Sequence, residues 1–359
     1  MPVAGQRDPE ATRKTLAEWL ARKLPEARSV AITALEIPQA SGFSNETFLF
    51  DARWDDRAGE QRARLVLRAQ PQEYGLFPTI DILRQQYRTM QLLGEHSDVP
   101  VARVRFAEPD PGVLGQPFFV MDRVEGQVPG DNPPHTVAGF LVELDPASRR
   151  KLHHSGLEAM TRVHRVDWRK LGFEHLDRPE FGARGREQLQ GYLRHYHDWA
   201  CEGKPHPVLD PARAWLDAHW PRDDAQVDLC WGDARIGNQM FRELRCVAVF
   251  DWEMASLANA ESDLGWWLFM QRFHTEGTGV PLPEGMLGRA ETIALWEEKV
   301  GRRAEHVDFY ELLGGYHFCI VMVMLAKNML RLLPGGFPAD FGVTQPGAVL
   351  LKKMLAEGV

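Results

Sequence analysis

Cysteine is scarce in this chain, and an excess of positive charge is absent. The four cysteines show no paired spacing, so we expect buried thiols in a reducing compartment and no disulfide framework. Acidic residues outnumber basic ones, 50 against 42, for a formal charge of −8. A nucleic-acid partner is therefore not expected, because phosphate backbones require a basic surface. The cysteines are Cys201, Cys230, Cys246 and Cys319.

Long apolar runs and metal-binding histidine patterns are lacking too. The most apolar run, Phe318–Ala326, has about half the length that spans a bilayer, so no membrane partner is expected. The N-terminus is polar and charged, unlike a secretory signal, and we expect a cytoplasmic protein. His195 and His197 do not predict a zinc site, because helical residues i and i+2 face apart and zinc needs three or four ligands. The sequence does not indicate an oligomeric state.

What the chain does contain is a dense group of polar side chains between residues 231 and 253. Asp233 precedes Asn238 by five residues, and two short apolar runs, 239–241 and 247–250, follow around a polar turn. These runs predict a β-hairpin that returns the chain to its start. Asn238 and Asp251 should then lie side by side, and their oxygens suit Mg²⁺, a hard cation. Asp233 is placed to accept a proton from an attacking hydroxyl group.

An Asp five residues before an Asn, followed by a second Asp, is the arrangement of kinase-type phosphoryl transfer. The alternative is plain turn chemistry, because Asp and Asn side chains bond nearby backbone in many loops. The hairpin and the terminal Asp251 favour the site. Asp263, at the start of the next apolar segment, either caps a helix or braces this loop. Arg235 either offsets charge on a transferring phosphoryl group or pairs with a carboxylate such as Asp263.

These residues resemble the core motif of the aminoglycoside phosphotransferase family, a group of kinase-like enzymes that phosphorylate small molecules. The family motif H-G-D-x-x-x-x-N is matched from Trp231 onward, with Trp in place of the usual His. The same departure occurs in the branch related to the kinase domain fused to some acyl-CoA dehydrogenases. The resemblance covers about residue 30 to the C-terminus and implies an α+β, bilobal, protein-kinase-like fold. It implies a strand-rich N-terminal lobe over residues 1–123 and a larger helical lobe over residues 124–359.

Local patterns predict elements in the order that this fold requires. Strand-like runs are expected at 31–37, 47–54, 62–68, 101–107 and 117–122, with a helix at 79–93 before the last two. An Asp followed by Pro predicts a helix start, because Asp caps the first turn and Pro suits its first position. We expect helices to start at three of these pairs, which begin at Asp8, Asp145 and Asp210. A further helix is expected at 307–332.

The resemblance also implies where a nucleotide binds. Segment 41–47, between the first two strands, would hold phosphates, and Ser44 and Asn45 are its best candidates. Taken alone, this segment is an ordinary hairpin turn. Met121 and Arg123 mark the segment that would meet the adenine through its backbone groups.

Arg68 stands where the family holds the α- and β-phosphates with a Lys or Arg, and a guanidinium can bond phosphate in bidentate fashion. Gln86 takes the position of the usual Glu partner of that residue. We therefore expect Mg²⁺-dependent transfer of the γ-phosphoryl group of ATP or GTP to the hydroxyl of a small molecule. The competing interpretation, favoured by Trp231 and Gln86, is a non-catalytic nucleotide-binding pseudokinase or scaffold.

The acceptor is expected to be neutral or anionic. Segment Gly182–Lys204, the expected lining of the acceptor site, carries four basic and three acidic side chains. It also carries Tyr192, Tyr196 and Trp199, which could line an apolar channel. A polycationic acceptor needs an acidic site, so a hydroxyacyl thioester is favoured over an antibiotic such as an aminoglycoside or macrolide. The alternative is that this helix faces solvent and its charges are irrelevant.

Overall fold

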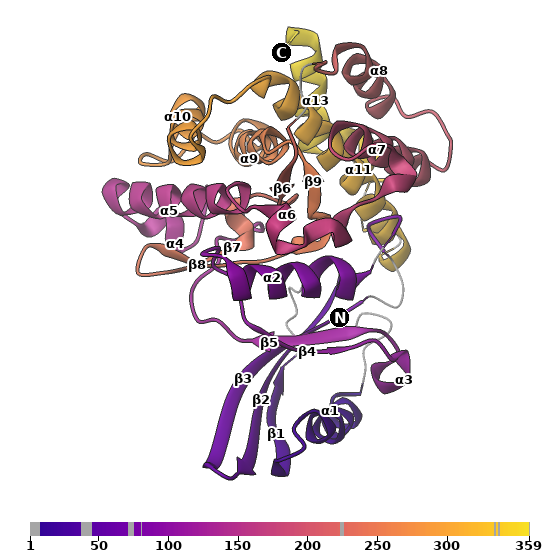
Figure 1. The fold of residues 1–359 in the computed structure, drawn as a ribbon. Helices are drawn as coiled ribbons and strands as arrows, with labels where there is room; N and C mark the ends of the chain where they lie inside the picture. The colour runs from indigo at the N-terminus through magenta and orange to yellow at the C-terminus, as the bar shows by residue number, and fades with distance from the viewer. Residues whose placement is uncertain are drawn as a thin grey trace. The chain divides into compact units, whose positions relative to one another are not determined.

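The computed structural model describes residues 8–36, 45–70, 75–79, 81–222, 226–333, 335–336 and 338–358. The chain divides into two compact units. The first comprises Met1–Gln91 and Ala102–Val124, and the second comprises Leu92–Val101 and Glu125–Val359. The first is rich in strands and the second in helices (Figure 1), which confirms the α+β class. The lobe boundary after residue 123 stays a prediction.

The first unit is an antiparallel five-stranded sheet with a helix packed against it. The strands pair in the order β1-β2-β3-β5-β4. Helix α1 (Pro9–Lys23) begins as predicted, since the Asp8 carboxylate accepts a hydrogen bond from the Glu10 N–H. The strands are β1 (Arg28–Glu36), β2 (Glu46–Asp56), β3 (Gly59–Ala69), β4 (Val104–Glu108) and β5 (Phe118–Asp122).

The apolar face of α1 forms part of the core of this unit. Leu16, Trp19 and Leu20 recur at helical spacing and are buried against the strands. The Trp19 indole N–H donates to the buried carboxylate of Glu108 at 2.7 Å, and the Lys23 ammonium lies 3.2 Å from the same carboxylate. Burial alone would raise the pKa of Glu108, but these donors hold it below its ordinary value.

The helix predicted at 79–93 begins differently from the expectation. A π-helical turn, η1 (Leu83–Tyr87), leads into α2 (Arg88–His96), and Gln86 is buried within that turn. Turns of this type are rare and have no clear sequence signature, so the pattern could not predict one. A short helix not predicted from the sequence, α3 (Pro111–Leu114), is capped by the Asp110 carboxylate.

The second unit is mainly helical, with two small antiparallel strand pairs. β6 (Asp228–Cys230) pairs with β9 (Ser256–Ala258), and β7 (Gln239–Arg242) pairs with β8 (Arg245–Val249). The longer helices are α5 (Pro146–His164), α7 (Arg186–Cys201), α8 (Leu209–His219), α9 (Glu261–His274), α10 (Arg289–Val300), α11 (Val307–Leu332) and α13 (Pro346–Glu357). The shorter ones are α4 (Phe140–Glu143), α6 (Trp168–Leu171) and α12 (Phe341–Thr344).

Two of the predicted helix starts in this unit can be compared directly. The Asp145 carboxylate accepts hydrogen bonds from two backbone N–H groups at the start of α5, so that prediction is confirmed. The prediction at Asp210 is wrong by two residues. Helix α8 begins at Leu209, and the Asp210 carboxylate accepts from the His206 N–H instead of capping the helix.

Helix α11 covers the predicted range and is unusually apolar. Its best 18-residue window has a mean hydropathy of 1.5, which is enough by length and composition to cross a membrane. However, 78% of that window is buried inside the structure, as in a core helix. Helix α9 packs against α11. A Cβ on Gly265 would lie 2.2 Å from the Tyr310 backbone, so this close approach requires glycine.

Candidate active site

The predicted hairpin is present and brings the ends of the motif together. Gln239 of β7 lies opposite Val249 of β8, and the Phe250 N–H donates to the Asn238 carbonyl at 3.1 Å. Asn238 therefore lies beside the chain segment that leads into Asp251, as the spacing predicted.

Three non-glycine residues of the hairpin have left-handed backbone. Glu243 and Leu244, the two turn residues, have φ of 51° and 62°. Such turns match the twist of the flanking strands. Asp251 has φ 60° and ψ 61° and directly precedes η5 (Trp252–Met254). This conformation costs about 1 kcal/mol or more outside glycine, and it is found mainly where the surrounding structure imposes it, as at functional sites.

The Asp233 carboxylate accepts hydrogen bonds from three side chains. Its Oδ1 accepts from the Trp266 indole N–H at 3.0 Å and from the Arg235 Nε at 3.1 Å. Its Oδ2 accepts from the Asn238 amide at 2.6 Å. Burial raises the pKa of Asp233 above its ordinary value, and the Asp251 carboxylate adds to this rise against the opposing charge of Arg235. With 16% of its surface still exposed, this side chain can act as a base.

Arg235 pairs with two carboxylates, and neither is Asp263. Its Nη1 donates to both oxygens of Asp131 at 2.7 Å, while its Nε bonds Asp233. A salt bridge is therefore present, but the partner named from the sequence is wrong. Burial opposes the charge of Arg235, yet Asp233 and Asp131 together raise its pKa above the ordinary value. It is thus a permanent cation beside Asp233.

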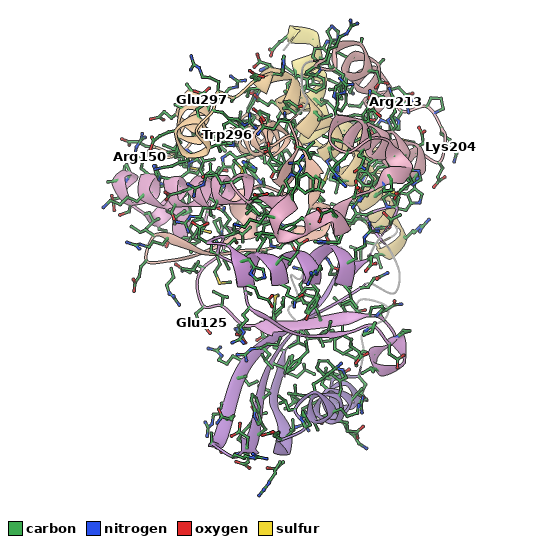
Figure 2. All side chains as sticks on the ribbon, in the orientation of Figure 1. Glu125, Arg150, Lys204, Arg213, Trp296 and Glu297 are labelled. Atoms are coloured by element: carbon green, nitrogen blue, oxygen red, sulfur yellow. The ribbon has the colours of Figure 1, made fainter. Side chains whose placement is uncertain are left out.

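Asp263 braces the loop that carries Asp233. It lies in the first turn of α9 but does not cap the helix, because its oxygens accept from the N–H groups of Trp231 and Gly232, at 2.6 and 2.8 Å. His164 Nε2 lies 3.0 Å from the same carboxylate. The Trp296 indole, labelled in Figure 2, donates to His164 Nδ1 at 3.0 Å. His164 Nε2 therefore carries the proton that faces Asp263.

Trp231, which stands in place of the family's His, ties this loop to the hairpin. Its side chain is fully buried, and its indole N–H donates to the Phe250 carbonyl at 2.9 Å. The next residue, Gly232, has φ 92°, and a Cβ there would lie 2.3 Å from the Met254 carbonyl oxygen. Trp231 therefore holds the catalytic loop to the segment that leads into Asp251.

A hollow borders the catalytic loop. Gly232 and Trp266 both line it, and Trp266 is also the residue that bonds Asp233. The Arg178 guanidinium, a further lining group, lies over the Tyr192 ring at 4.5 Å. Among the described lining residues, the carboxylate is that of Asp263, whose oxygens accept hydrogen bonds from N–H groups of the catalytic loop. Gln188, Leu189, Leu193, Leu313 and His317 complete much of the wall.

The expected acceptor segment 182–204 contributes aromatic surface to this hollow but not its charge. Tyr192 lines the hollow, Tyr196 is buried, and Trp199 is 37% exposed. None of the charged side chains of the segment lines the hollow, and three of its basic ones form ion pairs elsewhere, so its net charge does not describe the hollow. The basic group there is Arg178, which lies before the segment. The pairs are Arg184 with Asp177, Arg194 with Asp217, and Lys204 with Glu202.

The residues expected to bind nucleotide belong to the first unit. Ser44 lies outside the described residues, together with most of segment 41–47. Asn45 is buried directly before β2, and Arg68 lies opposite Phe119 of β5 in the sheet register. Their roles stay predictions. Gln86, Met121 and Arg123 lie in η1, in β5 and directly after β5.

The sequence did not single out Trp266 or Asp131. Trp266 follows Asp263 by three residues on one helix, and such residues share a helix face. That spacing was therefore an available indication that Trp266 faces the loop. Asp131 lies in a loop about a hundred residues before Arg235, and nothing in the sequence pattern joins the two.

Comparison with known proteins gives a consistent result. A family model described as "Phosphotransferase enzyme family" matches residues 36–298. A probable acyl-CoA dehydrogenase, IBR3, of Arabidopsis thaliana is 30% identical over 271 residues, which is 70% of this chain but 31% of that protein. The chain thus spans about a third of this curated relative.

Solved structures share the fold. A putative aminoglycoside phosphotransferase from Ralstonia eutropha matches with a TM-score of 0.68 and 22% identity, over 96% of this chain and 98% of that one. The GDP and kanamycin complex of APH(2″)-IIIa matches with a TM-score of 0.58 and 15% identity, over 95% and 99% of the two chains. The kinase-like fold expected from the motif is confirmed.

Proposed function

The chain belongs to the phosphotransferase enzyme family, and from this premise we propose that it transfers the γ-phosphoryl group of ATP or GTP to a hydroxyl of a neutral or anionic small molecule. The observation that carries the proposal is the environment of Asp233. Three donors fix this carboxylate, its pKa is raised, and Trp266 connects it to the hollow beside the loop. An acceptor in the hollow would present its hydroxyl to Asp233.

Each proposed step has a residue that suits it. Asp233 would orient the acceptor hydroxyl and take its proton as the oxygen attacks the γ-phosphorus. Arg235 would offset negative charge that develops on the transferring group. In the first unit, Arg68, Asn45 and Ser44 are proposed to hold the nucleotide phosphates.

Asn238 and Asp251 fit a magnesium ion by the chemistry of their atoms. The Asn238 amide nitrogen donates to Asp233, which leaves the amide oxygen available to a cation. The Asp251 carboxylate follows the residue that bonds the Asn238 backbone, and both groups are oxygen donors of the kind that Mg²⁺ prefers. A bound Mg²⁺ would supply positive charge to the nucleotide phosphates.

The lining of the hollow supports a neutral or anionic acceptor. Arg178 offers a positive charge, whereas the lining carboxylate, Asp263, is occupied by backbone N–H groups and His164. Burial lowers the pKa of His317 to about 3, so this imidazole is neutral at physiological pH. Among the described lining residues, a polycation would meet Arg178 and no free acid to balance it. A hydroxyacyl thioester suits this lining, and the name of the Arabidopsis relative agrees with such an acceptor.

A coupled nucleotide-consumption assay tests the proposal. Purified chain, Mg²⁺ and either ATP or GTP would be offered hydroxyacyl-CoA compounds, kanamycin-type aminoglycosides and macrolides. We expect turnover with the hydroxyacyl compounds and none in Asp233→Asn. Efficient phosphorylation of an aminoglycoside at micromolar concentration would overturn the acceptor class. Nucleotide binding without transfer to any compound of a broad alcohol panel would favour the non-catalytic alternative.

A matched pair of arginine variants sharpens the acceptor class. Arg178→Ala should raise KM for an anionic acceptor by about 10- to 100-fold, the value of a charge-assisted hydrogen bond, and leave KM for a neutral one nearly unchanged. Arg194→Ala removes an arginine that pairs with Asp217 on the surface and serves as the control. Equal effects of the two variants would remove Arg178 from acceptor recognition.

A further inference from the structure

Two buried histidines and one aspartate converge next to Arg235. Asp131 and His135 belong to one loop, and His274 is the last residue of α9. One ligand atom from each lies within 4.8 Å of the other two. His135 and His274 are 3% and 4% exposed, whereas the Asp131 side chain is 50% exposed. The three groups therefore form a small cluster that is closed on its histidine side and open at the carboxylate.

His274 is the member of this cluster that most needs a ligand. Both of its ring nitrogens are buried and make no hydrogen bond to any group in the described part of the chain. Its Nε2 is 3.6 Å from the Asp131 carboxylate, beyond hydrogen-bond length. Buried polar atoms are nearly always satisfied, and one that is not suggests an unseen ion or water.

His135 is oriented as a metal-binding histidine would be. Its Nδ1 lies 3.3 Å from the Gly130 carbonyl, which leaves Nε2 as the free lone pair. Metal-bound histidines usually donate their second ring N–H to such a backbone carbonyl. Both rings are buried, and each keeps a ring nitrogen that can bind a cation.

We propose that Asp131, His135 and His274 bind a divalent transition-metal ion, with Zn²⁺ the ion of choice, at a site separate from the magnesium ligands. Two imidazoles and one carboxylate with an open position are a ligand set typical of Zn²⁺ rather than Mg²⁺. Zinc bonds of about 2.0–2.2 Å bring tetrahedral ligand atoms to roughly 3.4 Å from one another. The half-exposed Asp131 side chain has the freedom to close that gap. A solvent molecule or an acceptor group would take the fourth position.

The ion and Arg235 would compete for the same carboxylate. Arg235 holds both Asp131 oxygens at 2.7 Å and also bonds Asp233. An ion bound to Asp131 weakens the first contact and repels the guanidinium. Metal binding at the site would therefore affect Asp233 through the Arg235 side chain.

Cobalt(II) is the probe that tests this site, because its visible absorption distinguishes four- or five-coordinate nitrogen-containing sites from octahedral oxygen sites. The full chain, stripped of metal, would be titrated with CoCl₂ in excess Mg²⁺, which occupies the oxygen ligands Asn238 and Asp251. We expect one Co²⁺ per chain with intense visible bands, displaced by one equivalent of Zn²⁺. This readout is independent of any phosphoryl transfer.

Variants assign the ligands. His274→Gln and Asp131→Asn should each weaken Co²⁺ binding by more than about 100-fold, beyond the 10- to 100-fold loss for outer partners of a metal site. Arg235→Gln should tighten it by about tenfold or more, because the competitor for Asp131 is removed. His219→Gln, at an exposed histidine on α8, should change nothing and controls for surface binding.

Two results would overturn the proposal. One is the absence of intense visible bands at saturating Co²⁺. The other is equal Co²⁺ affinity in the wild type and Asp131→Asn, a variant whose half-exposed position leaves the fold intact even if His274→Gln fails to fold. Either result would make the histidine pair a neutral packing element beside the Arg235–Asp131 ion pair.

Discussion

Each unit contains a largely enclosed carboxylate that accepts a hydrogen bond from a tryptophan indole, and the two carboxylates differ in the direction of their pKa shifts. In the first unit, Trp19 donates to Glu108, whose pKa is lowered. In the second, Trp266 donates to Asp233, whose pKa is raised. Lys23 accompanies Glu108, whereas Asp233 has the carboxylate of Asp251 as well as the cation Arg235 nearby. Both carboxylates accept the same kind of hydrogen bond from an indole. Burial and neighbouring charges therefore decide the direction of each pKa shift.

The comparison extends to the units as wholes. All thirteen histidines of the chain lie in the second unit. The residues expected to hold nucleotide in the first unit include Arg68, whose charge is permanent. The histidines are thus confined to the unit where the phosphoryl transfer is proposed. Four predictions test this division, and they follow in order of expected size.

The largest effect is expected at Asp233. Asp233→Asn should lower kcat by about 10²- to 10⁴-fold, the value of a positioned base, with nucleotide affinity nearly unchanged. Glu108→Gln removes the corresponding carboxylate of the first unit and should leave kcat within about twofold of the wild type. Steady-state kinetics and nucleotide titration give both numbers. Wild-type turnover in Asp233→Asn would show that Asp233 does not act as the base.

A smaller effect is expected at Asp251. Asp251→Ala should weaken Mg²⁺-dependent nucleotide binding by about tenfold or more, because a metal ligand is lost. Binding measured in a chelator should change little. Arg68→Gln, in the first unit, is the counterpart and should weaken binding in both conditions. If Asp251→Ala lowered both affinities equally, Asp251 would have a structural part instead.

Acid should destabilise the second unit before the first. Burial lowers the pKa of both His153 and His317 to about 3, below the unfolded value of about 6.5. The unfolded chain therefore binds more protons between these values, and stability is lost as pH falls from about 6.5 toward 3. Each such histidine contributes about 1.4 kcal/mol per pH unit in that window.

Hydrogen exchange of the two units as a function of pH measures this difference. Peptides from the second unit should lose protection first, and His317→Gln should reduce the pH dependence. The surface variant His219→Gln should leave it unchanged. Simultaneous loss of protection in both units, with the same slope, would contradict the comparison.

The smallest effect is expected on stability at neutral pH. Glu108→Gln should lower the free energy of unfolding by about 1–2 kcal/mol, since the folded state favours the ionised form through Trp19 and Lys23. Asp233→Asn should be neutral or stabilising, because burial disfavours the charge that it removes. Urea unfolding of both variants at pH 7 decides the signs. A stabilising Glu108→Gln would show that its lowered pKa does not reflect favourable contacts.

The sequence predicted most of what depends on short-range pattern. The hairpin after Asp233 followed from alternating apolar runs and a polar turn, and the starts of α1 and α5 followed from Asp8 and Asp145. The start at Asp210 failed because a pattern of Asp followed by Pro does not exclude a helix that begins earlier. The Asp210 carboxylate accepts a hydrogen bond from His206, which precedes α8, and does not cap the first turn of the helix.

What the sequence did not predict depends on contacts between distant residues. Arg235 meets Asp131 across 104 positions, and His135 meets His274 across 139. For Asp263 the sequence allowed both a cap and a brace, and the fold shows the brace. The charge of segment 182–204 was counted correctly, but a count does not reveal which side chains face a hollow.

The β7–β8 turn offers an engineering consequence. Glu243 and Leu244 occupy a conformation that Asn-Gly adopts with little strain. Replacing the pair by Asn-Gly would relieve about 1–2 kcal/mol per strained residue, at the end of the hairpin away from Asn238. Substitutions in this turn can thus raise the free energy of unfolding without altering the catalytic loop. A chain strengthened there would tolerate destabilising substitutions in its acceptor hollow, and so could acquire new acceptors more readily.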